Sequence, residues 1–270
     1  MDTDQTRTIL ETALKKAGAI LLERFGSTHL AVVKESISSV VTEADLASEK
    51  AILKILGSAP KPFNIITEES GYIDNGSSYA WVVDPLDGTS NFAAGLPWFG
   101  VIISLCHESE PVQASMYLPV GDQLFFAESG KGAWKNGVPI RTTNSIKLAE
   151  QLIAYSFDFS DETGKTDSEM QILSMLSTKV RNIRSTNSLV DFCYTADGRM
   201  GAAINQTTKI WDIAAPWLII REAGGVVTDI SGADITFNLS QSAINRNYTI
   251  VAAGAGIQGQ LMSILIKNKS

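Results

Sequence analysis

The sequence predicts an N-terminal α+β half followed by an α/β half, joined in one chain of 270 residues. Apolar side chains recur at helical spacing near the N-terminus, and short apolar strands follow them. From about Ile146 onward, strands and helices alternate, which is typical of an α/β layer arrangement. With 44% hydrophobic and 19% charged residues the chain can build an extensive core, so disorder, collagen-like repeats and coiled coil are disfavoured.

The first half begins with helices and continues as a sheet. Apolar residues three and four apart predict a helix over Thr3–Phe25, and Gly26 ends it. A short extended piece, Leu30–Lys34, leads to a second helix over Thr42–Leu56. In a mostly antiparallel sheet we then expect the strands Asn64–Thr67, Ala80–Asp84, Gly100–Cys106, Val112–Leu118 and Gln123–Glu128, before a turn at Asn136-Gly137.

The second half is predicted to alternate between strands and helices. Its strands are Leu152–Phe157, Val180–Arg184, Met200–Asn205, Val226–Ile230 and Tyr248–Ala253. Its helices are Ser168–Ser177, Ser188–Asp197, Ile213–Ala223 and a last one near Ile257–Lys267. Because no Pro/Gly/Ser-rich linker separates the halves, we expect two tightly packed subdomains, residues 1–145 and 146–270, that behave as one unit.

Charge and cysteine content exclude several classes of function. Lys and Arg number 22 against 29 Asp and Glu, and the net charge of −7 disfavours binding to a nucleic-acid polymer. Cys106 and Cys193 form no CxxC pattern, which argues against a disulfide scaffold or a structural zinc site and fits a reducing compartment. No apolar run approaches the roughly 20 residues of a membrane span, and the first residues lack the features of a signal peptide. We therefore expect a cytoplasmic protein that does not bind membranes.

The segment WVVDPLDGTSNF, Trp81–Phe92, is the most informative part of the sequence. An apolar strand leads to Asp84, and Asp87-Gly88 predicts a turn, so two carboxylates lie on one tight turn with the Leu86 carbonyl between them. Oxygen ligands of this kind suit hard divalent cations, and the following backbone N–H groups at Gly88 and Thr89 suit an anion. An ordinary strand-turn-helix connection is the alternative. An EF-hand calcium loop fits worse, since its third and fifth positions here are Leu86 and Gly88.

Three further acidic elements each have a structural interpretation when taken alone. Glu68-Glu69 follows a short strand and fits a solvated loop. Asp212 precedes an apolar helix that runs to Gly224-Gly225, with Pro216 in its first turn, and fits an N-cap. Thr42 and Asp45 have the spacing of a capping box.

Together the four elements resemble the inositol monophosphatase superfamily of magnesium-dependent, lithium-sensitive phosphatases. The resemblance covers nearly the whole chain, in the order Lys34, VTEAD (Val41–Asp45), ITEES (Ile66–Ser70), WVVDPLDGTSNF (Trp81–Phe92) and IWDIAAPWLIIREAGG (Ile210–Gly225). It implies a layered αβαβα sandwich of the inositol monophosphatase and fructose-1,6-bisphosphatase type. It also implies a homodimer and a metal site at the junction of the two halves.

The resemblance implies a set of metal ligands. Glu68, Asp84 and the Leu86 carbonyl would hold a first Mg²⁺, and Asp84, Asp87 and Asp212 would hold a second. Glu68 with water would hold a third, so each subunit would carry two or three Mg²⁺. Bound cations would reverse the local negative charge, and two of them roughly 3.5–4 Å apart would clamp the attacking and leaving oxygens.

The resemblance also implies the activity, which is hydrolysis of a small phosphate monoester by activated water. Thr89 with Asp45 would activate the water, with Glu68 assisting, and the Gly88 and Thr89 backbone would bind phosphate. No His, Cys or Ser nucleophile is required. His29 and His107 lie outside the matched motifs.

The substrate positions depart from the inositol-selective pattern. Asp87 and Asp212 would also contact substrate, whereas Thr186, Ser188 and Asn205 stand where such members present Gly, Ala and Glu. An amide at Asn205 changes charge and donor pattern, which weakens the expectation of myo-inositol selectivity. Inositol 1-phosphate or a related polyol or sugar phosphate is the first expectation, since TSNF (Thr89–Phe92) looks like the inositol branch. Histidinol phosphate, fructose bisphosphate, NADP and 3′-phosphoadenosine 5′-phosphate are the alternatives.

A second class of function stays open at this point. The same scaffold would serve a catalytically silent protein that binds a phosphometabolite for regulation. Such a protein would be expected to lose one of Glu68, Asp87, Thr89 or Asp212, and all four are present. A kinase or NTPase is disfavoured because the sequence has no G-x-x-x-x-G-K-[ST] string.

Overall fold

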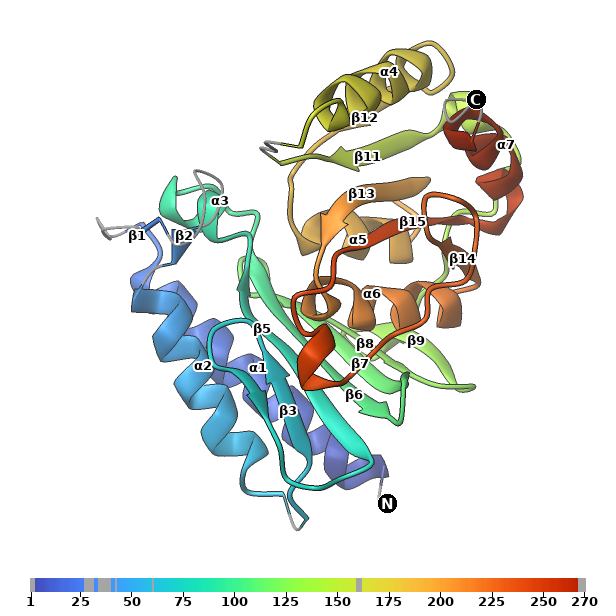
Figure 1. Ribbon diagram of the computed structural model, residues 1–270. Helices are drawn as coiled ribbons and strands as arrows, with labels where there is room; N and C mark the ends of the chain where they lie inside the picture. Colours follow the sequence, from blue (N-terminus) through green and yellow to red (C-terminus); the bar gives the residue numbers. More distant parts are fainter. Residues whose placement is uncertain are drawn as a thin grey trace.

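Helices and the two larger β-sheets alternate as five layers, and two short strands form a separate two-stranded sheet (Figure 1). The computed structural model describes residues 3–26, 32–33, 40–41, 43–59, 61–158 and 162–266. Helices α1 (Thr3–Arg24) and α2 (Glu43–Leu56) cover the outer face of the larger sheet. Helices α5 (Leu189–Ala196) and α6 (Ile210–Glu222) lie between the sheets, and α4 (Lys165–Ser177) and α7 (Ala255–Leu265) cover the smaller sheet. The predicted αβαβα sandwich is confirmed.

The larger sheet belongs to the first half of the chain. Its strands are β3 (Asn64–Thr67), β4 (Gly71–Ile73), β5 (Tyr79–Asp87), β6 (Gly100–His107), β7 (Glu110–Leu118), β8 (Gln123–Glu128), β9 (Gly132–Lys135) and β10 (Val138–Pro139). They lie in the order β10-β9-β8-β7-β6-β5-β3-β4. All neighbours are antiparallel except β3 and β5, which are parallel. The expectation of a mostly antiparallel sheet is therefore confirmed.

The smaller sheet belongs to the second half. Its strands are β11 (Leu152–Ser156), β12 (Asn182–Arg184), β13 (Ala202–Thr208), β14 (Gly225–Thr228) and β15 (Tyr248–Gly254), in the order β12-β11-β13-β15-β14. Strand β11 is parallel to both of its neighbours, and β15 is antiparallel to both of its own. The shorter elements are β1 (Val32–Val33), β2 (Val40–Val41), α3 (Thr89–Ala93) and two 3₁₀ turns, η1 (Leu148–Glu150) and η2 (Gln241–Ala243).

Long periodic segments and the hairpin turn agree with prediction, whereas short strands were missed. The bounds of β3 and β8 match the predicted ones, and α1 ends one residue before its predicted end. Asn136 and Gly137 have φ of 49° and 78° and join β9 to β10 as a two-residue hairpin loop. Strands β4, β9 and β10 were missed because two to four residues carry no readable period. Predictions on His29, Lys34 and Thr42 lie outside the described residues.

Three apolar cores separate the layers. One lies between α1, α2 and the larger sheet, and another lies between the smaller sheet and the α4–α7 layer. The central core joins both halves of the chain, because Ile102 and Met116 of the larger sheet share it with Leu218 of α6 and Ala252 of β15. The elements that meet at the central core are therefore held in fixed relative positions.

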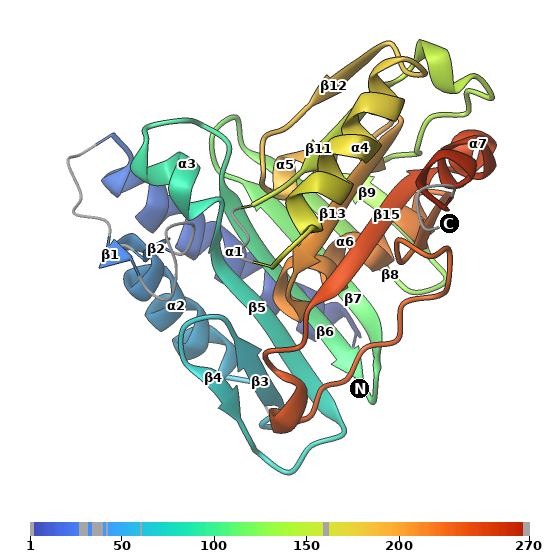
Figure 2. The same cartoon turned by 45° about the horizontal axis from the view of Figure 1, so that its top comes forward.

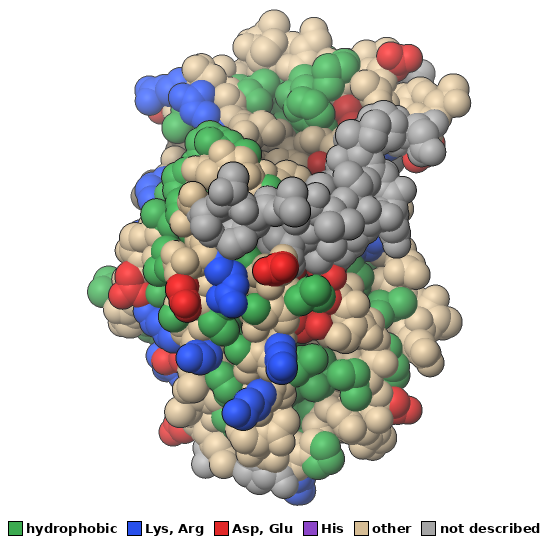
Figure 3. Space-filling view, turned by 90° about the vertical axis from the view of Figure 1, so that its left-hand side faces the viewer, with side chains coloured by type: hydrophobic (Ala, Val, Ile, Leu, Met, Phe, Trp, Pro, Cys, Tyr) green, Lys and Arg blue, Asp and Glu red, His purple; other side chains and the backbone are tan. Residues whose placement is uncertain are grey.

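The outer helical face carries both signs of charge. Figure 3 views the molecule from the side of α2, where Lys and Arg side chains lie among acidic and apolar ones.

Within the described ranges, no helix combines the length and the apolar composition needed to cross a bilayer.

Gly18 of α1 lies close to the larger sheet, so a larger side chain at this position tests how tightly α1 packs against the sheet. A Cβ at this position would lie 2.3 Å from Cε1 of the buried Tyr117 ring. Gly18→Ala is expected to lower the free energy of unfolding by about 1–3 kcal/mol, because the ring must move. Gly259 of α7 has no atom within 4 Å of its Cβ position, so Gly259→Ala is the matched control and should raise that free energy by about 1 kcal/mol. Denaturant unfolding of both variants measures this, and equal shifts would contradict the close approach of α1.

Candidate active site and metal centre

Helix α6 lies over the larger sheet next to β5 (Figure 2). Three carboxylates from these two elements meet there. One oxygen each of Asp84, Asp87 and Asp212 lies within 4.8 Å of the others. Asp84 and Asp87 come from the end of β5, and Asp212 comes from the first turn of α6, which packs against β5. The structure thus brings together three of the predicted metal ligands.

A bulge in β5 places Asp84 and Asp87 on the same side. In a regular strand, residues three apart point to opposite faces. Here Asp84 pairs with Ile102 and Asp87 with Gly100, so β5 has one residue more than β6 over this stretch. Because of this extra residue, the Asp87 side chain points to the same face of the sheet as that of Asp84. The tight turn predicted for this pair is therefore wrong, since the strand continues to Asp87 and the chain bends at Gly88, whose φ is 83°.

Asp212 is the third residue of α6, three positions beyond the N-cap position predicted for it. The helix begins at Ile210 with Lys209 as N-cap, and the Lys209 backbone N–H donates to Asp212 Oδ2 at 2.6 Å. The prediction of Asp212 as N-cap is therefore wrong. Pro216 consequently lies in the helix interior and not in the first turn. Because proline has no backbone N–H, it cannot donate the helical hydrogen bond to the Asp212 carbonyl.

Backbone N–H groups hold one oxygen of each carboxylate. Leu86 N–H donates to Asp84 Oδ1 at 3.0 Å, and Leu189 N–H donates to Asp87 Oδ1 at 2.5 Å. With the Lys209 bond to Asp212, each side chain is oriented by a donor from a different segment. These bonds fix the direction of the second oxygen of each carboxylate.

Glu68 lies beside this cluster at the end of β3. Its backbone N–H donates to the Val83 carbonyl at 3.3 Å, which places Glu68 next to Asp84 on the neighbouring strand. Its charge contributes to the raised pKa of both Asp84 and Asp87. The structure therefore places Glu68 where its charge acts on the cluster, outside the set of three closest carboxylates.

Thr89 and Asp45 meet on the helical side of the cluster. Thr89 Oγ1 lies 3.0 Å from Asp45 Oδ1 and 2.9 Å from the Leu86 carbonyl. Asp45 is 1% exposed. The hydroxyl has one proton, so it donates to one of these acceptors at a time, and a carbonyl oxygen keeps a second lone pair for another ligand. Asp45 is thus held next to Thr89, the contact that joint action of these two residues would require.

The predicted substrate residues lie in two places. Thr186 Oγ1 and Ser188 Oγ are 3.0 Å apart at the start of α5, and a Cβ on Gly88 would lie 3.2 Å from that of Ser188. Both residues therefore adjoin the acidic cluster. Asn205 lies on β13 opposite Ser156 of β11, and its side-chain oxygen accepts from Thr207 N–H at 2.8 Å.

Burial raises the pKa of all three clustered carboxyls. It holds the pKa of Asp84 well above the usual range, and the charges of neighbouring carboxylates, Glu68 first, add to the rise. Burial raises the pKa of Asp87 to about 7 and that of Asp212 to about 8, although a backbone hydrogen bond lowers each. Buried like charges are tolerated when they bind protons or cations. An all-oxygen donor set of this kind fits Mg²⁺.

Comparison with known proteins agrees with this geometry. The sequence model of the inositol monophosphatase family matches residues 2–268. The chain belongs to the inositol monophosphatase family. It is 32% identical over 262 residues to an inositol-1-monophosphatase of Mesorhizobium japonicum, which covers 96% of this chain and 95% of that one. It is 35% identical over 223 residues to a Pasteurella multocida protein named Nus factor SuhB, covering 82% and 83%.

The solved structures agree on the fold. The extragenic suppressor protein suhB from Bartonella henselae has a TM-score of 0.88 at 32% identity, and the match covers 97% of this chain and 99% of that one. The predicted fold type, that of inositol monophosphatase and fructose-1,6-bisphosphatase, is confirmed. Membership supports phosphatase chemistry and Mg²⁺ dependence at the level of the family.

Helix α2 contributes a carboxylate that the sequence analysis missed. Glu49 Oε1 accepts from Thr67 Oγ1 at 2.7 Å and from Ser70 N–H at 3.0 Å, and Oε2 accepts from Ser70 Oγ at 2.6 Å. These bonds hold both sides of the Glu68 loop. Ser48, one residue earlier, donates to the Pro85 carbonyl at 2.6 Å. The helical spacing from Asp45 to Ser48 and Glu49 was the signal available in the sequence.

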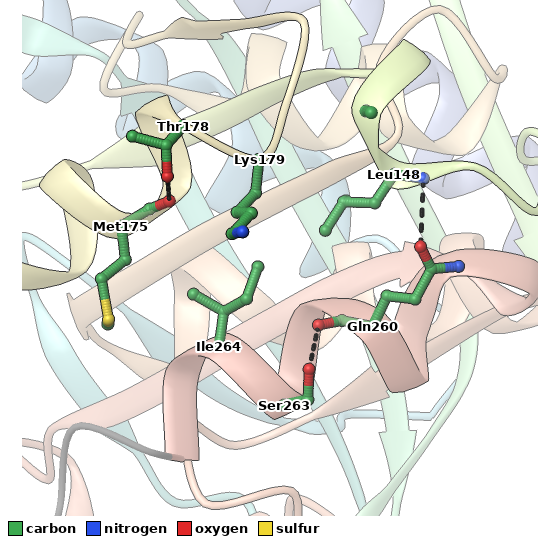
Figure 4. A pocket seen from close by; sticks show the side chains of 8 residues that line it. Leu148, Met175, Thr178, Lys179, Gln260, Ser263 and Ile264 are labelled. Atoms are coloured by element: carbon green, nitrogen blue, oxygen red, sulfur yellow. Dashed lines mark hydrogen bonds between the residues drawn. The ribbon is translucent and has the colours of Figure 1, made fainter.

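A groove of about 470 Å³ between η1, α4 and α7 lies apart from the cluster. Figure 4 shows Leu148, Lys179 and Ile264 directed toward the same space. Among the described residues that line it, Lys179 is the only charged side chain, and none is a carboxylate. This groove therefore lacks the ligands for a metal centre.

Replacing Asp212 tests the electrostatics of the cluster. An unfolded Asp loses its proton near pH 4, whereas folded Asp212 keeps it to about pH 8. Between about pH 4 and pH 8 the folded state therefore binds more protons than the unfolded state. The stabilisation of the folded state by the protonated Asp212 carboxyl is complete below about pH 4 and is lost as the pH rises through about 8. In metal-free protein, Asp212→Asn should therefore raise the melting temperature more at about pH 8.5 than at about pH 5.5. Each kcal/mol added to the free energy of unfolding corresponds to a rise of about 2–4 °C.

The control is Asp234→Asn, because the Asp234 side chain is 86% exposed. Thermal unfolding in a chelating buffer is the measurement. A shift for Asp212→Asn that is equal at both pH values would contradict the raised pKa.

Glu49 is expected to position Glu68 for metal binding. Glu49→Ala removes both acceptor oxygens and with them the three bonds to Thr67 and Ser70 on either side of Glu68. The Mg²⁺ concentration that half-maximally raises the melting temperature should increase by about tenfold. Lys50→Gln, an exposed change on the same helix, is the control. Equal Mg²⁺ titrations for the two variants would show that Glu49 does not act on the metal site.

Proposed function

We propose that the protein hydrolyses a small phosphate monoester in a Mg²⁺-dependent reaction, with inositol 1-phosphate or a related polyol or sugar phosphate as substrate. The observation that carries this proposal is the cluster of the buried Asp84 with the half-buried Asp87 and Asp212, with the Thr89–Asp45 pair beside it. Family membership supports the same chemistry.

The metal ligands are divided between two main positions. Glu68, Asp84 and the Leu86 carbonyl would hold one Mg²⁺, and Asp84, Asp87 and Asp212 would hold the other, with a third ion at Glu68. When bound, Mg²⁺ lowers the pKa of water and neutralises charge on the leaving oxygen. Each subunit would carry two or three ions. Lithium is expected to inhibit, as the family resemblance implies.

Thr89 and Asp45 would activate the attacking water. Thr89 Oγ1 accepts a proton from the water as it passes its own proton to Asp45 Oδ1, which lies 3.0 Å away. Burial of Asp45 keeps this carboxylate in place. Glu68 assists by orienting the water, and the Gly88 and Thr89 N–H groups bind phosphate oxygens.

The alcohol portion of the substrate would lie toward α5 and β13. Asp87, Asp212, Thr186, Ser188 and Asn205 would contact it. Because Asn205 provides an amide, histidinol phosphate, fructose bisphosphate, NADP and 3′-phosphoadenosine 5′-phosphate stay as alternative substrates.

A binding protein without turnover is the second candidate function. The name of the Pasteurella multocida relative, Nus factor SuhB, favours this candidate. The complete set of Glu68, Asp87, Thr89 and Asp212 favours the enzyme. Phosphate release distinguishes the two, because both would be stabilised by Mg²⁺ and phosphate.

Further proposals concern the setting of the enzyme. A homodimer is proposed from the family resemblance, with residues 1–145 and 146–270 as subdomains of each subunit. A cytoplasmic location is proposed because Cys106 and Cys193 are free, buried thiols.

Asp84→Asn tests the proposed function. Asp84 would contact both metal ions, so its loss should lower phosphate release by about 100-fold or more. Stability of the metal-free variant should be equal to or above that of the wild type, because one repelling charge is gone. Phosphate release from inositol 1-phosphate, histidinol phosphate, fructose 1,6-bisphosphate, NADP and 3′-phosphoadenosine 5′-phosphate, with and without Mg²⁺, is the measurement.

Asp234→Asn is again the control and should keep full activity. A folded wild-type protein that released phosphate from none of these esters with Mg²⁺ would refute the proposal. Unchanged kinetics in Asp84→Asn would refute the role of that residue.

A further inference from the structure

The Asn91 side chain connects three segments around the proposed active site. Asn91 is the third residue of α3, which begins at Thr89. Its Nδ2 donates to the Trp98 carbonyl at 2.9 Å and to the Thr186 carbonyl at 2.8 Å. A primary amide has two N–H bonds and both acceptors are carbonyls, so the orientation of the amide is fixed and both donors are used. Asn91 therefore joins α3 to the segment before β6 and to the segment before α5.

Gly88, whose N–H would bind phosphate, packs against the same two segments. A Cβ on Gly88 would lie 2.5 Å from the Trp98 carbonyl oxygen and 3.2 Å from Ser188 Cβ. Even a methyl group at this position would therefore clash with the Trp98 backbone. Because the packing is this close, the position of the Thr186 segment sets the distance between the phosphate site and the residues that would contact the alcohol.

The turn that starts at Thr186 contains an unfavourable backbone conformation. Asn187 has a φ of 52°, in the left-handed region. A non-glycine residue in this region costs free energy, although Asn tolerates it better than most residues do. The Thr186 carbonyl belongs to the peptide group between Thr186 and Asn187, and the orientation of this peptide group sets the φ of Asn187. The bond from Asn91 to this carbonyl therefore opposes relaxation of the turn.

Other bonds anchor the turn on either side of this peptide group. Thr186 N–H donates to Asp191 Oδ2 at 3.2 Å, and Leu189 N–H donates to Asp87 Oδ1 at 2.5 Å. The Leu189 bond orients a proposed metal ligand and does not involve Asn91. Loss of the Asn91 bonds should therefore release the Thr186 side of the turn and leave Asp87 oriented.

We propose that Asn91 positions the Thr186–Ser188 turn against the phosphate site and thereby determines how strongly the protein selects the alcohol portion of its ester. This inference rests on the proposed phosphatase function and adds a residue to its substrate side. Asn91 is a positioning residue and not a catalytic one, because both of its N–H groups are bound to backbone carbonyls and it acts through Thr186.

Two variants without the amide donors test this inference. Asn91→Ala removes the side chain, and Asn91→Leu keeps its approximate size without N–H groups. The substrates are phenyl phosphate, whose leaving group carries no further hydroxyl, and whichever of the esters named above has the highest kcat/KM. With Mg²⁺ at about pH 7, each variant should lower kcat/KM for that ester by about tenfold, mainly through a higher KM, because the turn no longer holds its contacts in place. The kcat/KM for phenyl phosphate should change by less than about twofold.

Ser90→Ala, an exposed change on α3, is the matched control and should leave both kcat/KM values unchanged. The Mg²⁺ concentration that half-maximally raises the melting temperature should stay within about twofold of wild type in both Asn91 variants, because the bond from Leu189 to Asp87 remains. A larger shift would place the effect at the metal site and overturn the assignment to the turn.

The kinetic outcomes separate this inference from the function on which it rests. An equal loss for both substrates, or an unchanged kcat/KM for the better ester in folded Asn91→Leu, would overturn the inference and leave the phosphatase function standing. The same would follow if wild-type protein hydrolysed phenyl phosphate at least as efficiently as every other ester, since the alcohol portion would then contribute no selectivity. A selective loss in Ser90→Ala would overturn the assignment to Asn91. Absence of phosphate release from all of these esters by folded wild-type protein would overturn the proposed function itself.

Discussion

Mutual repulsion of buried and half-buried carboxylates is the interaction on which the arrangement of this site depends. Asp84, Asp87 and Asp212 are brought together in a region that water solvates poorly, so none gains the full hydration of an exposed Asp. The apolar contacts of the central core hold α6 against the larger sheet and oppose this repulsion. Protons or cations relieve the remaining cost. A site of this kind suits cations, and the phosphate chemistry that we propose depends on their charge.

The surrounding structure turns a repelling cluster into an ordered one. Each clustered carboxylate accepts one backbone N–H, from Leu86, Leu189 or Lys209. Helix α2 adds a second set of contacts through Asp45, Ser48 and Glu49, which reach both acidic loops of the larger sheet. These donors and acceptors come from elements with buried faces, so they move little. Fixed geometry is what allows oxygen ligands to act together on a substrate.

The metal side and the substrate side of the site differ in how closely they follow the family. The family model matches residues 2–268, and the fold matches solved structures of the family. The proposed substrate side has Thr186, Ser188 and Asn205 where the resemblance implies Gly, Ala and Glu for inositol-selective members. A shared scaffold with a changed pocket is how one fold serves several substrates. Relatives named inositol-1-monophosphatase and Nus factor SuhB show that names also vary on this scaffold.

Local sequence determined the long helices, the strands with clear alternation and the acidic motifs, because period and turn chemistry act between near neighbours. It could not determine the β5 bulge, which needs the register with β6, or the start of α6 at Ile210. The contacts of Glu49 also depend on partners elsewhere in the chain, Thr67 and Ser70. Such contacts are set by how layers pack, and packing energy is a property of the whole tertiary structure.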